Sequence, residues 1–209
     1  MSDDRPRDRR SIAVAITGAS GALYATRTVA ALLERGCHLD LIVSEYGRRL
    51  LRDELGDAAT IDKLGDYLAS TYGDAVRAGT YALHRNKDLG AKLASGSQDC
   101  EAMVVVPCSM KTLAGIAHGL SRNLVERAAD VMLKEHRTLI IVPRETPMSL
   151  PQLRNMVLRA EAGAMLMPAM PAFYQMPNTL DDLADFMAGK ILSALGFRHA
   201  LYPSWEGRG

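Results

Sequence analysis

Ile12-Ala-Val-Ala-Ile16, followed by Thr17-Gly-Ala-Ser-Gly-Ala22, is the part of the sequence that decides the fold. Five small or branched apolar residues in a row are typical of a strand buried on both faces, and a helix-like segment follows the glycine-rich turn. Such a turn lies at the carboxyl edge of an open α/β sheet, where its backbone N–H groups can bind a phosphate. Many α/β proteins also need a tight turn there for packing alone. Because Ser20 replaces the middle glycine of G-x-G-x-x-G, the turn favours a mononucleotide over a dinucleotide.

The rest of the chain repeats this alternation of short apolar runs and longer amphipathic segments. The runs predict strands, and the segments predict helices that end before Gly36, Gly56 and Gly196. We therefore expect an α/β fold with a mostly parallel sheet, helices on both faces and a single domain. The predicted strands are 12–16, 39–43, 103–106, 139–142 and 164–167. The predicted helices are 23–34, 46–55, 124–136 and 180–195, the last with Thr179 as N-cap. Residues 57–100 have irregular apolar spacing, so no element is assigned there.

Composition limits the classes of function. The chain has 209 residues, 48% of them hydrophobic, which is enough for one well-packed domain. The formal net charge is +1 with both signs interspersed, so no nucleic acid or anionic membrane partner is expected. Residues 1–10 are polar and predict a mobile tail before a domain that spans 11–209. Without a secretory signal or a membrane-spanning run, we expect a cytoplasmic protein.

The cysteines and histidines show no metal-ligand spacing. Cys37, Cys100 and Cys108 form no CxxC pair and are expected to be free thiols. The five histidines include no H-x-x-H or H-E-x-x-H motif, so no metal site is predicted.

Two further strands are followed directly by polar residues. Arg144-Glu-Thr-Pro147 comes after an apolar run, and charged side chains at that edge are candidates for binding an anionic substrate. Pro107-Cys-Ser-Met-Lys-Thr112 follows another strand and opens a helix, whose N-terminus can hold a phosphate. Cys108 is a candidate nucleophile, but no His or Asn at a recognisable spacing pairs with it. A buried structural cysteine is therefore the favoured interpretation.

Other polar residues have two interpretations each. Ser20 and Ser44 can bind a cofactor or cap a helix. Lys134, Arg144, Glu145 and Lys190 can be ordinary surface charges or can bind an anionic substrate, and the position of Arg144 and Glu145 directly after a strand favours binding. Tyr174 lies in a segment, 165–177, that is rich in Met and Pro and predicts a rigid apolar wall rather than a helix. Its hydroxyl can donate to a ligand or simply lie at the surface.

Taken in order, several motifs resemble those of the flavin prenyltransferases of the UbiX type, once described as aromatic-acid decarboxylases. The resemblance runs from about Ile12 to Trp205. The motifs are Thr17-Gly-Ala-Ser-Gly21, Ser95-Gly-Ser97, Pro107-Cys-Ser109, Asn123-Leu-Val-Glu-Arg-Ala-Ala-Asp130, Leu133-Lys-Glu135, Pro143-Arg-Glu-Thr-Pro147, Pro171-Ala-Phe-Tyr174 and Trp205. From the residues alone, Ser95-Gly-Ser97 is a plain turn or a phosphate-contacting loop, and the turn is favoured.

The resemblance implies a flavodoxin-like Rossmann fold, a three-layer sandwich that binds reduced FMN. It implies that the enzyme attaches a dimethylallyl group from dimethylallyl monophosphate to N5 and C6 of the flavin, which closes a fourth ring. The prenylated FMN would then pass to a partner decarboxylase. A homododecamer with sites at subunit junctions is also implied.

The resemblance also assigns roles to individual residues. The implied FMN-binding residues are Gly18, Ala19, Ser20, Ser44, Ser109, Met110, Lys111, Thr112 and Arg144. The implied residues at or near the prenyl phosphate are Arg127, Lys134, Arg144, Glu145, Tyr174 and Lys190. The implied catalytic groups are Ser20, Glu54, Lys134 and Glu145. No metal is implied, so these cations and the Tyr174 hydroxyl would stabilise the leaving phosphate, while Ser20 and Glu54 would relay the proton lost from the flavin.

The sequence departs from the family pattern at two positions. Leu89 stands where some members have an aromatic residue over the flavin, and Lys190 stands where others have Arg, which gives a point charge in place of a bidentate fork. A flavin-dependent decarboxylase of cysteine-containing substrates is the nearest rival, but its catalytic His and its Asn-containing Met-rich clamp are not found. A non-catalytic FMN carrier is the second rival. Lys134, Glu145, Tyr174 and Lys190 favour catalysis over that carrier.

Overall fold

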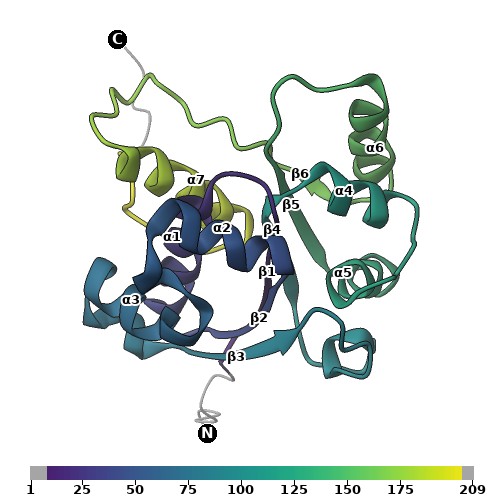
Figure 1. Ribbon diagram of the computed structural model, residues 1–209, viewed down its shortest axis with the longest axis horizontal. Helices are drawn as coiled ribbons and strands as arrows, with labels where there is room; N and C mark the ends of the chain where they lie inside the picture. Colours follow the sequence, from purple (N-terminus) through teal and green to yellow (C-terminus); the bar gives the residue numbers. More distant parts are fainter. Residues whose placement is uncertain (1–8, 204–209) are drawn as a thin grey trace, which may run out of the picture.

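The computed structural model describes residues 9–203, and within them the chain forms one parallel sheet of six strands (Figure 1). The strand order is β3-β2-β1-β4-β5-β6. The strands are β1 (Ser11–Ile16), β2 (His38–Val43), β3 (Thr80–Arg85), β4 (Ala102–Cys108), β5 (Thr138–Pro143) and β6 (Met165–Leu166). The flavodoxin-like α/β sandwich and the single domain expected from the sequence are confirmed.

Helices cover both faces of the sheet. They are α1 (Ala22–Leu33), α2 (Glu45–Leu55), α3 (Leu64–Tyr72), α4 (Met110–Ala117), α5 (Leu124–Lys134), α6 (Leu150–Glu161) and α7 (Leu180–Ala194). Helices α1, α3 and α7 lie on one face of the sheet, and α4 and α5 lie on the other (Figure 1). The buried side chains of each group form a separate core with the sheet. Strands β1 and β4 lie between the two cores, which explains their almost completely buried, continuously apolar sequences.

The five predicted strands and four predicted helices all form, with ends that differ by a few residues. The sequence pattern misses β3, because this edge strand is half exposed and has no continuous apolar run. It also misses α3 and α6. Helix α6 has no buried residue, so its apolar side chains do not follow a core-facing stripe.

Residues 1–8 of the expected tail and residues 204–209, including Trp205, lie outside the described residues. Arg9 donates from Nη1 to Thr80 Oγ1 at 2.9 Å, and the Arg10 guanidinium lies 4.0 Å from the centre of the Phe197 ring. In the part of the chain from 9 to 203, no helix has both the length and the apolarity needed to span a membrane.

Candidate functional site

The turns after β1 and β4 are joined into one surface at the carboxyl edge of the sheet. The Thr17 hydroxyl donates to the Pro107 carbonyl oxygen at 2.9 Å and accepts from the Ser109 amide at 2.8 Å. The Arg144 amide, which follows β5, donates to the Cys108 carbonyl oxygen at 3.3 Å. The structure thus brings together the sequence-predicted groups that follow these three strands. Thr17 was not among the predicted site residues, although its place directly after a buried strand is the signal that could have found it.

Ser44 and Ser109 each cap a helix that starts at this edge. The Ser44 hydroxyl accepts from the Gly47 amide at 3.0 Å, which caps α2, and the Ser109 hydroxyl accepts from the Thr112 amide at 3.3 Å, which caps α4. Met110 and Lys111 open α4, so their amides have no partner one turn earlier in the helix. The capping interpretation of Ser44 is therefore correct, and the same geometry presents positive helix ends to the edge.

Glu54 lies against the loop that carries Ser20. Its Oε2 accepts from the amides of Gly21 at 3.0 Å and Ala22 at 2.8 Å. Gly21, the N-cap residue of α1, provides no side-chain cap, so Glu54 from the last turn of α2 supplies it. A carboxylate is favourable at this position because the helix dipole is positive there. The structure therefore places the Glu54 carboxylate against the residues that directly follow Ser20.

The carboxyl edge fits an anionic, hydrogen-bonding ligand such as FMN. Within residues 9–203, Nε of Arg144 is buried without an acceptor, and the amides of Gly18 and Ser20 have no acceptor in this part of the chain either. A buried guanidinium N–H without a partner costs free energy, which an anionic ligand would recover. There is little spare room in the loop itself, since a Cβ added to Gly18 would lie 2.4 Å from Tyr46 Cβ.

Tyr24 is a second residue that the sequence analysis missed. It stands in the first turn of α1, and its hydroxyl is close enough to Arg144 for that charge to affect it. Burial raises the pKa of the Tyr24 phenol above its ordinary value, while the Arg144 charge opposes this rise. Tyr24 is therefore a neutral phenol at the same edge.

Cys108 is not available as a nucleophile. The side chain is fully buried, and burial raises the pKa of its thiol far above the ordinary value. All three cysteines are buried free thiols, as expected from their spacing. No three His, Cys, Asp or Glu side chains gather as metal ligands among the residues that the structure describes.

Arg127 and Lys134 lie on α5 and not at the carboxyl edge. Helix α5 begins where the Leu124 amide donates to the Asn86 carbonyl oxygen at 2.8 Å, just beyond the carboxyl end of β3. It runs antiparallel to the strands and ends with Lys134, four residues before β5 starts, so Lys134 is at the amino edge. There its ammonium lies 3.5 Å from the Glu135 carboxylate. One chain therefore does not bring Lys134 to Arg144.

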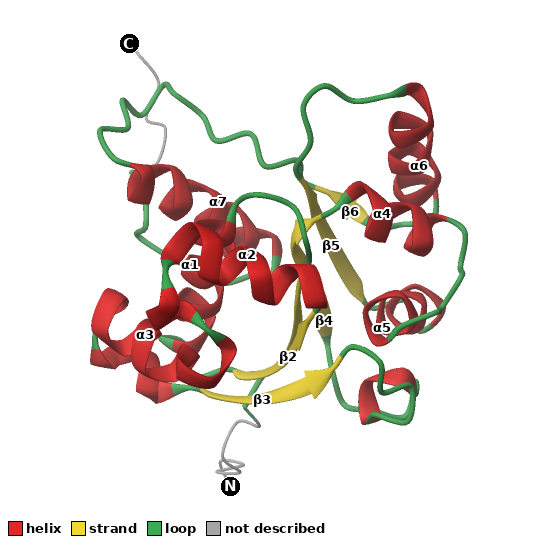
Figure 2. Cartoon of the chain, viewed as in Figure 1, coloured by secondary structure: helices red, strands yellow, loops and turns green. Residues whose placement is uncertain are grey.

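Tyr174 and Lys190 both lie beside the ring of Phe186, a residue of α7. The Tyr174 and Phe186 rings are 6.3 Å apart at 86°, and the Lys190 ammonium lies 5.3 Å from the centre of the Phe186 ring. Figure 2 shows the segment that carries Tyr174 as a loop running from the sheet to α7, as its Met and Pro content predicted. Phe186 and Tyr202, whose ring is 5.0 Å from Phe186, were not predicted as site residues.

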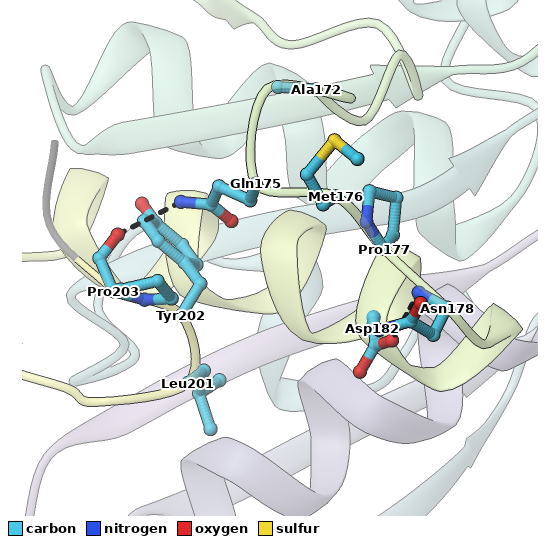
Figure 3. A pocket seen from close by; sticks show the side chains of 9 residues that line it. All are labelled: Ala172, Gln175, Met176, Pro177, Asn178, Asp182, Leu201, Tyr202 and Pro203. Carbon is cyan, nitrogen blue, oxygen red and sulfur yellow. Dashed lines mark hydrogen bonds between the residues drawn. The ribbon is translucent and has the colours of Figure 1, made fainter. Parts of the chain in front are cut away.

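A cavity of about 160 Å³ lies beside this cluster (Figure 3). It is bounded by the loop residues Gln175 and Met176 on one side and by Leu201 and Tyr202 on the other. The Gln175 Nε2 atom donates to the Pro203 carbonyl oxygen at 2.9 Å, which ties the two sides together (Figure 3). Because ligand pockets usually enclose about 300–1,000 Å³, this cavity is too small for a flavin.

Comparison with known proteins agrees with this geometry. The Flavoprotein family model matches residues 1–192. The flavin prenyltransferase UbiX of Halalkalibacterium halodurans is 45% identical over 192 residues, which cover 92% of this chain and 91% of that protein. The structure of AnUbiX (PadA1), solved in complex with FMN and dimethylallyl pyrophosphate, has a TM-score of 0.85 and 36% identity, and the match covers 96% of this chain and 100% of that one.

A second solved structure, a dodecameric FMN-dependent UbiX-like decarboxylase from Escherichia coli O157:H7, has a TM-score of 0.82 and 36% identity. The match covers 94% of this chain and 100% of that one. The chain therefore belongs to the Flavoprotein family and, within it, to the UbiX flavin prenyltransferases.

Proposed function

We propose that this protein joins the dimethylallyl group of dimethylallyl monophosphate to N5 and C6 of reduced FMN. The observation that supports this best is Arg144, a guanidinium with a buried and unpartnered Nε at the edge where two capped helices also begin. Bound there, reduced FMN supplies the electron-rich ring that accepts the prenyl group. The proposed FMN contacts are Gly18, Ala19, Ser20, Ser44, Ser109, Met110, Lys111, Thr112 and Arg144.

The leaving group is the chemical problem that these residues must solve. When the allylic C–O bond breaks, the electron pair stays on the phosphate, whose added negative charge must be stabilised. Lys134, Arg144 and Lys190, with the Tyr174 hydroxyl, supply that charge and hydrogen bonding. Arg127 lies near the phosphate, and Glu145 sits beside it when protonated or bridged to a cation. The Met- and Pro-rich loop excludes water from the cationic centre.

The flavin ring also loses a proton in this reaction. Ser20 Oγ and a Glu54 carboxylate oxygen are the proposed acceptors. Glu54 is held in place by its two contacts with the amides of Gly21 and Ala22, so it stays next to Ser20 without a change of conformation. Its position is the physical support for this assignment.

The proposed active unit is an oligomer, with homododecamer as the specific form. Lys134 ends α5 at the amino edge, so it can reach a phosphate at a carboxyl edge only if that edge belongs to another copy. Helix α6 offers a surface for such contacts, because it exposes Leu150, Leu153, Val157 and Leu158. The dodecameric relative at 36% identity supports the same assembly. The prenylated FMN then passes to a decarboxylase that uses it as cofactor.

An anaerobic reaction tests the proposal. The protein is mixed with reduced FMN, dimethylallyl monophosphate and a chelator, and the flavin is analysed by mass spectrometry. We expect a flavin heavier by one five-carbon unit, and its loss in Arg144→Met. Arg49→Met is the matched control, because Arg49 is exposed on α2 and pairs with Asp53. An unchanged flavin with the wild-type protein would reject prenyl transfer, and it would favour an FMN carrier or a cysteine-substrate decarboxylase.

A further inference from the structure

Lys190 is held by aromatic rings and not by acids. Its ammonium lies 5.3 Å from the centre of the Phe186 ring and 5.8 Å from that of Tyr202. Residues 186 and 190 are one turn apart on α7, and helical side chains lean toward the N-terminus, so the lysine stem runs back over the Phe186 ring. Among the described residues, Lys190 makes no ion pair with a carboxylate.

This environment suits a lysine that must bind a phosphate. A carboxylate partner would neutralise the ammonium and occupy its N–H groups, whereas aromatic faces attract the cation and leave most donors for a ligand. Lysine also lacks the rigid fork of arginine, so its position depends on what surrounds it. Two rings at an angle of 34° supply that constraint.

The sequence makes room for this arrangement at one position of α7. A Cβ added to Gly189 would lie 2.4 Å from Tyr202 Cε1 and 2.7 Å from His199 Cε1. Glycine therefore lets the segment after α7 pack closely on the helix. The His199 ring, 4.9 Å from Tyr202, is bonded to Ser193 Oγ at 2.9 Å and fixes the segment from the other side. The Gln175 contact to Pro203, the residue after Tyr202, adds a further restraint (Figure 3). These interactions hold the Tyr202 ring 5.8 Å from the Lys190 ammonium.

We infer that Phe186 and Tyr202 are positioning residues, which hold the Lys190 ammonium, and through Phe186 also the Tyr174 ring, in the geometry that binds the phosphate of the prenyl donor. This inference rests on the proposed function of Lys190 and Tyr174. Phe186 is 7% exposed and belongs to the core, whereas Tyr202 is partly exposed, so Tyr202 is the cleaner residue to change.

The test is a binding cycle on the oligomeric protein loaded with oxidised FMN, which cannot turn over. Dissociation constants for dimethylallyl monophosphate are measured by calorimetry for wild type, Tyr202→Leu, Lys190→Met and the double variant. We expect Tyr202→Leu to weaken binding by about three- to ten-fold, the size of one cation–π contact, with FMN affinity unchanged. Tyr202→Phe keeps the aromatic ring and should bind the donor as tightly as wild type. Gly189→Ala displaces the ring and weakens binding like Tyr202→Leu.

The decisive comparison is the double variant. If Tyr202 acts through Lys190, Tyr202→Leu has no further effect once Lys190 is Met. An equal loss in both backgrounds, or no loss in either, would overturn the inference. Phe197→Leu is the structural control: its ring packs against Arg10 in the same core, and its loss should leave donor binding unchanged. The two proposals fail separately. If the effects of Tyr202→Leu and Lys190→Met on donor binding are coupled but the wild-type protein does not prenylate FMN, only the proposed function is rejected. If the wild-type protein prenylates FMN but the two effects are not coupled, only this inference is rejected.

Discussion

Helices α1 and α6 have the same length, twelve residues, but opposite environments. Helix α1 buries nine of its residues against the sheet and α7, whereas α6 buries none. Helix α6 nevertheless starts with a complete capping box, in which the Ser149 amide donates to Gln152 Oε1 at 2.7 Å. A well-formed helix with 55% of Val157 exposed is typical of a surface that is covered in an assembly.

The proposed site residues divide in the same way. The loops after β1, β2, β4 and β5 meet at one edge and are tied together by hydrogen bonds within one chain. Lys134 lies at the opposite edge, and Lys190 lies on α7. The contrast supports the proposal that the flavin-binding half of the site lies within one chain, and that assembly with another copy brings Lys134 to the phosphate-binding half.

The largest effect is expected from a variant that disrupts the contact between subunits. In the double variant Leu153→Asp with Val157→Asp, charges replace two exposed apolar side chains of α6. Because neither is buried in one chain, the fold should persist and the oligomer should dissociate. Prenyl transfer should fall by at least about 100-fold, since losing one group that stabilises developing charge already costs that much.

Light scattering and circular dichroism measure assembly and fold in this variant. Leu83→Asp, at an equally exposed leucine on β3, is the control and should stay oligomeric. A double variant that keeps the wild-type mass would show that α6 is not at the interface.

A smaller effect is expected from a change in the flavin-binding half of the site, where α2 packs against the end of β1. A Cβ on residue 47 would lie 2.4 Å from the Ile16 carbonyl oxygen, so Gly47→Ala forces α2 away from β1. We expect a loss of about 2 kcal/mol in the free energy of unfolding, typical of overpacking. Urea titration measures it, with Arg48→Ala as an exposed neighbour that should change stability by less than about 0.5 kcal/mol. Equal stabilities would contradict the tight contact.

Glu54→Ala tests the same part of the site, because it removes the side chain that caps the N-terminus of α1. The amides of Gly21 and Ala22 lose their acceptor, which should cost about 1 kcal/mol and lower the melting temperature by about 2–4 °C. Glu54→Gln keeps an acceptor oxygen and should lose less stability. If Glu54 moves the proton as proposed, both variants slow prenyl transfer. Full activity in Glu54→Gln would reject that role but not the cap.

The smallest effect concerns Cys108, the last residue of β4 at the carboxyl edge of the sheet. Burial raises the pKa of its thiol, so below the ordinary thiol pKa the folded protein holds no thiolate there. We expect iodoacetamide at about pH 8 to leave Cys108 unmodified in the folded protein and to modify it after unfolding. Peptide mass spectrometry reads both states, and rapid alkylation of the folded form would mean that this edge opens.

Sequence reasoning succeeded where burial leaves a continuous signal. The runs that became β1, β4 and β5 are buried on both faces, so strand, order along the chain and carboxyl-edge residues such as Ser109 and Arg144 were predictable. Edge strand β3 and exposed α6 leave no such pattern. Phe186 reads as an ordinary core aromatic, because its contact with Lys190 depends on how α7 and the chain after it pack. The position of Lys134 at the amino edge was not predictable either, because it depends on the direction in which α5 runs across the sheet.

The central claim is that one site combines residues of two copies, and subunit complementation tests it most directly. Arg144→Met and Lys134→Met, each inactive alone, are unfolded together, refolded as a one-to-one mixture and assayed for prenylated FMN. The account predicts recovery of about a quarter of wild-type activity, the fraction of junctions in a random mixture that receive an intact half from each copy. A mixture as inactive as its two components would contradict the claim.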